Sequence, residues 1–325
     1  MDGFKTYRQK DILAYVKIRE GETKIGQQVA ILGENEELES SAAHFVLLGI
    51  PEDIGIAANY GIRGSATAWQ ATLKAFLNTQ SNVFFNSAEV LVLGHFEFNL
   101  SVDANRAQQL QKVSWIDEQV YPLIQRIVTA GKVPIVIGGG HNNAYPIIKG
   151  GALALGQKLN VINIDAHADL RPTDGRHSGN GFSYAFLHNY LQCYRIFGLQ
   201  QNYLNTAMFE FIQDNPDIQV RYLEELLASG DPGESFRTFT TGLEHPVGLE
   251  IDLDAISGVL SSAATPSGIT LNALRGMLLA LRQKLSYLHI CEGAVSLEDG
   301  RTDPQTGKTI SFLITDFIKA QRAIG

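Results

Sequence analysis

The 325-residue sequence predicts an α/β fold, in which a doubly wound, mostly parallel sheet carries helices on both of its faces. Three observations favour this class. Short apolar runs recur along the chain and hardly alternate with polar residues, which is typical of strands covered on both faces. Longer segments between them repeat apolar residues every three or four positions, as amphipathic helices do. Polar side chains also follow several apolar runs directly, where open α/β sheets bind their ligands.

Six apolar runs are expected to form strands, because they are short and rich in aliphatic and β-branched residues. The first covers residues 44–50 and is stopped by Pro51. The others are residues 90–93, 133–137, 161–164, 194–197 and 247–251. The first forty residues read as an irregular or β-rich N-terminal extension. No linker or internal repeat marks a boundary, so a single domain over residues 1–325 is expected.

Three helices have clear apolar periodicity. The longest is expected over residues 110–127, with Asp103 as its N-terminal cap. A second begins after Thr270 and presents leucines at positions 271, 274, 278 and 281 on one stripe. A third covers roughly residues 310–322, after a turn-rich loop.

Composition excludes several classes of protein. The charge balance of 26 basic against 34 acidic residues, net −8, argues against nucleic acid or an anionic membrane as the main partner. No apolar run reaches the roughly 18 residues that a membrane span needs. Two cysteines, Cys193 and Cys291, are too few for a disulfide scaffold, and the first residues lack an apolar signal segment. We therefore expect a cytoplasmic protein. The charged fraction of 18% favours burial of surface between subunits.

Three polar clusters directly follow apolar runs, at residues 138–143, 165–169 and 252–254. Residues two apart in an extended backbone point to the same side, so the acidic and imidazole side chains of each cluster are expected to converge. The candidate metal ligands are His141, Asp165, His167, Asp169, Asp252 and Asp254.

Each cluster has an ordinary interpretation when taken alone. A glycine run after a strand is typical of a tight turn or a phosphate loop, and a lone Asp-x-Asp pair is often a capping or solvated pair. Their occurrence together at strand ends favours a metal site. Four carboxylates and two imidazoles exceed the needs of one ion and fit two ions that share carboxylates. Ligands rich in carboxylate and free of thiolate favour Mn²⁺ over a structural Zn²⁺.

These motifs resemble the ureohydrolases, the family of arginase, agmatinase and formimidoylglutamase. Family members contain Gly-Gly-x-His, Asp-Ala-His-x-Asp and Asp-x-Asp elements in this order, which here are residues 138–141, 165–169 and 252–254. The resemblance runs from about Leu48 to the C-terminal helix and implies an arginase-like three-layer sandwich. It implies one Mn²⁺ bound by His141, Asp165, Asp169 and Asp252, and a second bound by Asp165, His167, Asp252 and Asp254, with Asp165 and Asp252 bridging.

The resemblance also implies a chemistry. The carbon of an amidine or guanidine is a poor electrophile, and metal coordination supplies a nucleophile by lowering the pKa of water. Glu292 is expected to anchor the cationic amidine group. A proton for the leaving nitrogen is expected from a metal-ligating aspartate, Asp169, or from His177 in the substrate loop.

Departures from the family pattern bear on the substrate. Arginases and agmatinases usually have Asp where Gly140 stands, and Gly140 looks more like the formimidoylglutamases. Arg171, two residues after Asp169, also resembles them and is expected to pair with a substrate carboxylate. Residues 177–182 cover the family's substrate loop, in which Asn180 is expected to contact substrate.

Two further departures lie beside the site. The family often has Ser where Glu250 stands, and Asp where His289 stands.

The sequence therefore predicts a dinuclear manganese hydrolase of linear amidines. The favoured reaction converts N-formimidoyl-glutamate and water to glutamate and formamide. Within the family, the alternative is an arginase- or agmatinase-type guanidino ureohydrolase that releases urea; the alternative of another class is a catalytically inactive metal-binding homologue. A zinc deacetylase would use paired histidines, and no His-His pair occurs. A homo-oligomer, either a trimer or a hexamer, is expected, with a small molecule as the substrate.

Overall fold

One sheet of nine strands runs through the residues that the structure, a computed structural model, describes: 3–34, 36–98 and 104–324. Its strand order is β1-β3-β2-β4-β9-β8-β5-β6-β7. All neighbouring strands are parallel except β1, which pairs antiparallel with β3. The strands are β1 (Phe4–Thr6), β2 (Phe45–Gly49), β3 (Val90–Phe96), β4 (Val133–Ile137), β5 (Leu159–Ile164), β6 (Leu191–Leu199), β7 (Ile218–Tyr222), β8 (Val247–Asp252) and β9 (Tyr287–Cys291).

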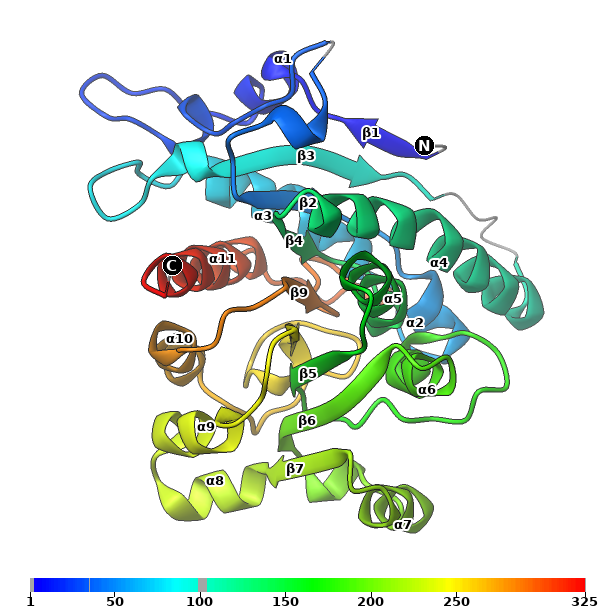
Figure 1. The fold of residues 1–325 in the computed structure, drawn as a ribbon. Coiled ribbons are helices and arrows are strands. Elements are labelled where there is room, and N and C mark those ends of the chain that lie inside the picture. Colours follow the sequence, from blue (N-terminus) through cyan, green and yellow to red (C-terminus); the bar gives the residue numbers. More distant parts are fainter. Residues whose placement is uncertain (1–2, 35, 99–103, 325) are drawn as a thin grey trace.

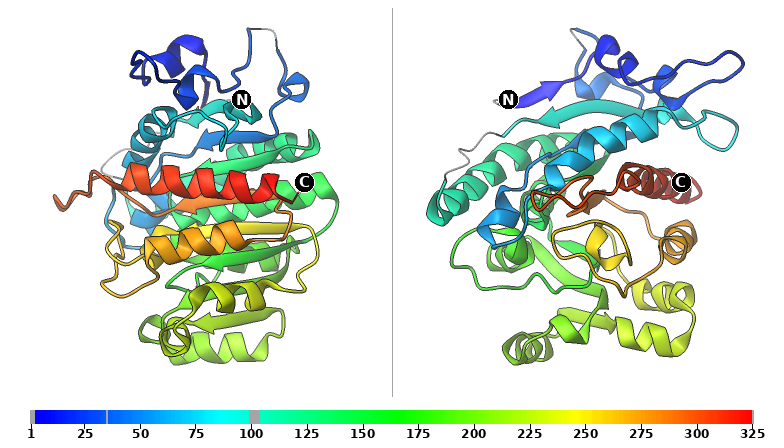
Figure 2. Two further views of the ribbon diagram at one scale, coloured as in Figure 1. Left: turned by 90° about the vertical axis from the view of Figure 1, so that its left-hand side faces the viewer. Right: turned by 180° about the vertical axis from the view of Figure 1, so that it is seen from behind.

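Helices cover both faces of this sheet, which Figure 1 shows almost edge-on. On one face lie α3, α8, α9, α10 and α11, and Figure 2 shows α10 and α11 side by side there. On the other face lie α4, α5, α6 and α7. The helices are α1 (Gln9–Leu13), α2 (Ile54–Ala58), α3 (Ala68–Leu77), α4 (Arg106–Thr129), α5 (Ala144–Leu155), α6 (Gly181–Leu187), α7 (Thr206–Asp214), α8 (Leu223–Ser229), α9 (Pro232–Thr240), α10 (Leu271–Ala280) and α11 (Thr306–Arg322).

The apolar strands form this three-layer arrangement because successive side chains of a strand point to opposite faces. In β2, Phe45 and Leu47 enter the core beneath α3 and α11, whereas Val46 and Leu48 enter the core beneath α4 and α5. Both faces of a central strand are therefore buried, which explains why the strands do not alternate between apolar and polar residues. The predicted α/β class, with a mostly parallel sheet and helices on both faces, is confirmed.

Some elements differ from the sequence-based expectation. The six strands expected from the sequence do not include β1, β7 or β9. The strand β7 pairs with β6 alone and carries Gln219 and Arg221, so it lacks a continuous apolar run. The strand β9 is fully buried although His289 lies at its centre. The helix α4 is capped by Asn105, whose side chain accepts a hydrogen bond from the backbone N of Gln108 at 3.1 Å. The expected cap, Asp103, lies outside the described residues.

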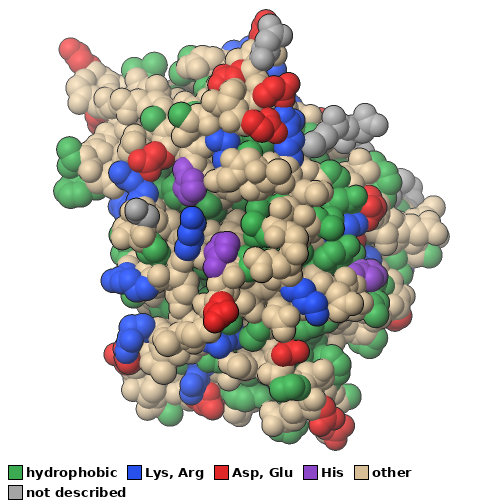
Figure 3. Space-filling view, in the orientation of Figure 1, with side chains coloured by type: hydrophobic (Ala, Val, Ile, Leu, Met, Phe, Trp, Pro, Cys, Tyr) green, Lys and Arg blue, Asp and Glu red, His purple; other side chains and the backbone are tan. Residues whose placement is uncertain are grey.

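Four adjacent central strands, β4, β9, β8 and β5, end at the same edge of the sheet. The predicted metal ligands lie at or directly after the ends of β4, β5 and β8, and Glu292 follows β9, as the rule for open α/β sheets leads one to expect. On the face seen in Figure 3, acidic and basic side chains are interspersed and form no continuous basic surface of the kind that nucleic acid binds. Among the described helices, none has the length and apolar character needed to cross a membrane.

Candidate metal centre and active site

The glycine turn after β4 presents His141 to the edge of the sheet. Gly138 and Gly139 have positive φ angles of 89° and 81°, a conformation that other residues rarely adopt. A Cβ atom on Gly139 would lie 2.3 Å from Nδ2 of Asn143 and 2.9 Å from the carbonyl oxygen of Ile50. This close approach requires glycine, so the run is a tight turn that places His141, the first of the candidate metal ligands.

A buried carboxylate that the sequence analysis missed holds this turn in place. Glu52 accepts hydrogen bonds from the backbone N of Gly140 at 3.1 Å and from Nδ2 of Asn143 at 2.7 Å. It also accepts from the backbone N of Ile54, at the start of α2, at 2.8 Å. Burial raises the pKa of Glu52. The available signal was an acidic residue directly after the first buried strand and Pro51.

The first group of metal donors surrounds one nitrogen of His141. Its Nδ1 lies 3.2 Å from Oδ2 of Asp165, 3.0 Å from Oδ2 of Asp169 and 3.2 Å from Oδ2 of Asp252. One donor atom from each of these four residues lies within 4.8 Å of the others. Three oxygens and one imidazole nitrogen at this separation are the donor set of one divalent ion.

The second group consists of Asp165, His167 and Asp254. Nδ1 of His167 lies 3.0 Å from Oδ2 of Asp254 and 3.7 Å from Oδ1 of Asp165. Asp165 is thus shared between the groups, as a bridging ligand would be. Asp252 falls in the first group only, so its predicted bridging role stays a prediction.

The structure therefore brings all six predicted ligands together, although their backbone is less regular than the sequence suggested. Asp254 lies in a short 3-10 helix after β8, and its backbone N donates to Oδ1 of Asp252 at 2.9 Å. Asp169 has a positive φ of 49°, and so bends back toward His141. Glu292 also has a positive φ, 62°. Such strain in residues other than glycine is typical of functional sites.

The donor atoms fit a pair of cations. Both ring nitrogens of His141 and Oδ1 of Asp254 are buried without a hydrogen-bond partner among the described residues. Burial raises the pKa of Asp252 and of Asp254, the latter to about 6. Burial alone would lower the pKa of His167, but Asp254 and Asp165 raise it to about 12. Several carboxylates buried so close together carry negative charge that bound divalent cations would neutralise.

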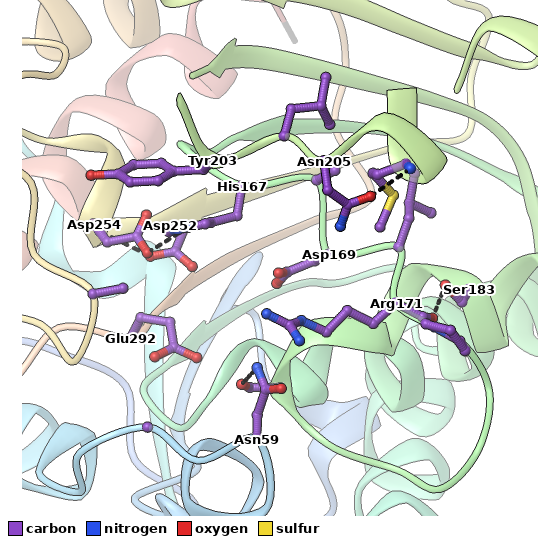
Figure 4. A pocket seen from close by; sticks show the side chains of 18 of the residues that line it. Asn59, His167, Asp169, Arg171, Ser183, Tyr203, Asn205, Asp252, Asp254 and Glu292 are labelled. Atoms are coloured by element: carbon purple, nitrogen blue, oxygen red, sulfur yellow. Dashed lines mark hydrogen bonds and ion pairs between the residues drawn. The ribbon is translucent and has the colours of Figure 1, made fainter. Parts of the chain in front are cut away.

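A cavity of about 860 Å³ opens in front of these donors and is lined by residues from several loops. Figure 4 shows Glu292, Asp169, Asp252 and Asp254 around it. Oε1 of Glu292 accepts a hydrogen bond from the backbone N of His141 at 2.8 Å, which fixes its carboxylate beside the metal donors. Burial and the neighbouring Asp252 raise the pKa of Glu292.

Arg171 is the one Lys or Arg side chain among the described residues that line this cavity. Its backbone is held by two hydrogen bonds: its N donates to the carbonyl oxygen of Gly179 at 2.9 Å, and Oγ of Ser183 donates to its carbonyl oxygen at 2.8 Å. Its guanidinium points inward, toward Asn59 and Asp169 (Figure 4). Asn59, a cavity residue that the sequence analysis did not single out, ends α2 and donates to Oγ of Ser178 at 3.2 Å.

Residues 43–310 match the model of the arginase family. The chain belongs to that family. A formimidoylglutamase of Streptococcus pyogenes is 30% identical over 224 residues, which cover 66% of this chain and 65% of the relative. The chain thus matches just under two thirds of the length of this curated relative. A formimidoylglutamase of Bacillus subtilis superposes with a TM-score of 0.75 at 15% identity, covering 94% of each chain. A Trypanosoma cruzi formiminoglutamase solved with Mn²⁺ superposes with a TM-score of 0.71 at 19% identity. The match covers 92% of this chain and 98% of the other.

In this arginase-family chain, two residues of the expected substrate loop do not line the cavity. Asn180 is buried, and its side chain is fully engaged by the loop itself. Its Oδ1 accepts from Nη1 of Arg176 at 2.7 Å, and its Nδ2 donates to the carbonyl oxygen of Gly175 at 2.8 Å. Asn180 therefore shapes the loop that presents Arg171. Its expected contact with substrate stays a prediction. Arg176 in turn pairs with the buried Asp117 of α4, from Nε to Oδ2 at 2.8 Å.

His177 is likewise buried and is not a cavity residue. Its Nδ1 accepts a hydrogen bond from the backbone N of Gly179 at 3.2 Å. Burial lowers the pKa of His177 to about 4, although the negative charge of Asp174 acts to raise it. The expected role of His177 as a proton donor to substrate stays a prediction, because the contacts of Nδ1 leave the role of Nε2 open.

The low pKa of His177 predicts a loss of stability in acid. The folded state binds this proton less readily than the unfolded state, in which the pKa is about 6.5. The contribution of His177 to the free energy of unfolding is complete above pH 6.5 and is lost as the pH falls toward 4. Arg171, Arg176 and Arg106 lower the same pKa.

The test is urea unfolding of the wild type and of His177→Asn between pH 7.5 and pH 4.5. Asparagine keeps an acceptor for Gly179 without a titrating ring. We expect the wild type to lose more stability than the variant across this window. Parallel curves for the two proteins would contradict the prediction.

Proposed function

We propose that the chain is a dinuclear Mn²⁺ hydrolase that converts N-formimidoyl-glutamate and water to glutamate and formamide. One observation carries the proposal: a single cavity combines two groups of metal donors, the carboxylate of Glu292 and the cationic side chain of Arg171. Formimidoyl-glutamate is cationic at its amidine end and dianionic at the other, so its charges complement the two ends of this cavity. The names of the relatives in Streptococcus pyogenes and Bacillus subtilis support the same choice.

The chain's own residues divide the work. One Mn²⁺ would be held by His141, Asp165, Asp169 and Asp252, and the other by Asp165, His167 and Asp254. The assignment made from the sequence also gives Asp252 to the second ion. A pair of ions held there would lower the pKa of water toward neutrality and so provide a nucleophile.

Glu292 binds the amidinium and fixes the reacting carbon beside these donors. Asp169, which also lines the cavity, passes a proton to the leaving nitrogen, because it is a carboxyl group facing both the metal donors and the substrate space.

The decisive experiment is product analysis with the Mn²⁺-loaded protein. Formimidoyl-glutamate, arginine, agmatine and guanidinobutyrate are offered separately, and formamide, ammonia and urea are quantified. Formamide and glutamate from the first substrate are expected. Urea from a guanidine would instead favour the ureohydrolase alternative, and no product from any substrate would favour the inactive homologue.

Replacing Arg171 with alanine is expected to lower kcat/KM for formimidoyl-glutamate by about 10- to 100-fold, since a charge-assisted hydrogen bond is lost. Agmatine lacks a carboxylate, so any turnover of agmatine should be unaffected. The kcat/KM of Arg171→Lys should lie between those of the wild type and Arg171→Ala, because lysine keeps the positive charge but lacks the planar guanidinium group. Unchanged turnover of formimidoyl-glutamate in Arg171→Ala would remove Arg171 from the substrate site.

We further propose that the protein is cytoplasmic and forms a homo-oligomer, a trimer or a hexamer. The support is the low charged fraction of 18% together with exposed apolar side chains. Val83 and Phe84, on the loop between α3 and β3, are 93% and 74% exposed. Light scattering at micromolar concentration should give a multiple of the 35.6 kDa chain mass, and a species of that single mass would contradict the proposal.

A further inference from the structure

A buried acid and a buried histidine lie directly behind the metal donors and have no part in the function proposed above. Glu250 of β8 and His289 of β9 are partners in the parallel register of these strands, and both are completely buried. Nδ1 of His289 lies 2.5 Å from Oε2 of Glu250. The hydroxyl of Tyr287 donates to Oε1 of Glu250 at 2.7 Å. None of the three lines the cavity, so none touches substrate.

The carboxylate of Glu250 faces the far nitrogen of His141. While Nδ1 of His141 points at the three aspartates of the first group, its Nε2 lies 3.5 Å from Oε2 of Glu250. A neutral imidazole has a lone pair on one nitrogen and a proton on the other. If Nδ1 is to bind a metal ion, Nε2 must carry the proton and needs an acceptor. Histidine ligands in proteins generally donate this second N–H to a carboxylate or carbonyl.

His289 ties the carboxylate to the turn that carries His141. Its Nε2 lies 3.4 Å from the carbonyl oxygen of Gly138, the first residue of that turn. Positions 250 and 289, two of the positions at which this chain departs from the pattern of its family, therefore contact each other beside His141. Sγ of Cys291 also lies within 4.8 Å of a ring nitrogen of His141, but a thiol is a weaker acceptor than a carboxylate.

We propose that Glu250, supported by His289, is a positioning residue that keeps the Nδ1 lone pair of His141 directed at the first metal group. Loss of the carboxylate frees the ring to hold its proton on Nδ1 or to rotate, and either change removes one donor from that group. The second group, built from Asp165, His167 and Asp254, does not include His141 and is unaffected. The proposal rests on the metal centre proposed above, and it concerns metal occupancy rather than the identity of the substrate.

The test is Mn²⁺ binding by the full chain, measured by calorimetry and by electron paramagnetic resonance. Glu250→Gln keeps the size of the side chain, and Glu250→Met also removes the acceptor. In Glu250→Gln we expect the first ion to bind about 10- to 100-fold more weakly and the second to bind as in the wild type, with a larger loss in Glu250→Met. At Mn²⁺ levels that fill only the second group, the spectrum should change from that of a spin-coupled pair to that of isolated Mn²⁺.

Two matched variants separate this role from a general effect on the core. Tyr287→Phe removes the other hydrogen bond to Glu250 but leaves Oε2 in place, and Cys291→Ala removes the competing thiol. Both should keep two ions and the coupled spectrum. Wild-type affinity for both ions in Glu250→Gln and Glu250→Met would overturn the proposal, as would an equal weakening of both ions. A wild type that binds fewer than two ions would overturn the metal centre and this inference together, whereas failure to turn over formimidoyl-glutamate alone would leave two-ion binding intact.

Discussion

Replacement of Asp165 with alanine is expected to remove both metal ions and, with them, all turnover. Asp165 is the donor common to the two groups, so its loss leaves only His141, Asp169 and Asp252 in the first group and His167 and Asp254 in the second. Its position is also fixed from behind, because Nδ2 of Asn163 donates to its Oδ2 at 2.9 Å. Metal content measured after dialysis, alongside kcat with added Mn²⁺, checks both parts of the prediction.

Asp254→Ala is the matched control, since Asp254 belongs to the second group alone. It should retain the ion bound at His141 and lose only its neighbour. If Asp165→Ala kept one tightly bound ion, the shared ligand would have been assigned to the wrong residue.

Replacement of Glu292 with glutamine is expected to lower kcat/KM by about 10- to 100-fold for every amidine or guanidine that the enzyme accepts. All such substrates present a similar amidinium or guanidinium cation, and the neutral side chain of glutamine cannot balance this positive charge. Glutamine can still accept the hydrogen bond from the backbone N of His141, so the metal donors should stay in place. Steady-state kinetics over the substrate panel, with metal content measured in parallel, provide the test.

Glu298→Gln removes a nearby acidic group that is largely exposed, and it should leave the kinetics unchanged. An effect of Glu292→Gln on formimidoyl-glutamate that is absent for a guanidine substrate would show that Glu292 recognises something other than the shared cationic head.

The metal donors could be predicted from the sequence because their signal is local. Asp165, His167 and Asp169 follow a buried strand at once, and the rule that ligands bind beyond the carboxyl ends of strands places them with Asp252 without knowledge of the strand order. The three-layer fold was equally accessible, since runs such as 133–137 are apolar on both faces.

The remaining parts of the site depend on contacts between distant segments. Glu52 and Asn143 are 91 positions apart, and nothing near Glu52 in the sequence shows that it supports the His141 turn. Asn180 and His177 sit in the loop that the family uses for substrate, but Arg176 and Asp117 draw this part of the loop into the protein. The sequence therefore predicted that this loop lies near the cavity. It did not show which side chains of the loop face the cavity, because that depends on packing against distant segments.

The place of β9 in the sheet has a consequence for how the protein matures. The strand formed last along the chain lies between β4 and β8, and it alone joins the half of the sheet built from β1 to β4 to the half built from β5 to β8. Before residues 287–291 dock, His141 stands on one half and the aspartates on the other. The first group of donors, which combines His141 with Asp165, Asp169 and Asp252, therefore comes together only when β9 lies between β4 and β8. The first group thus depends on the closing of the sheet, whereas the second group lies on β5 and β8, which are neighbours.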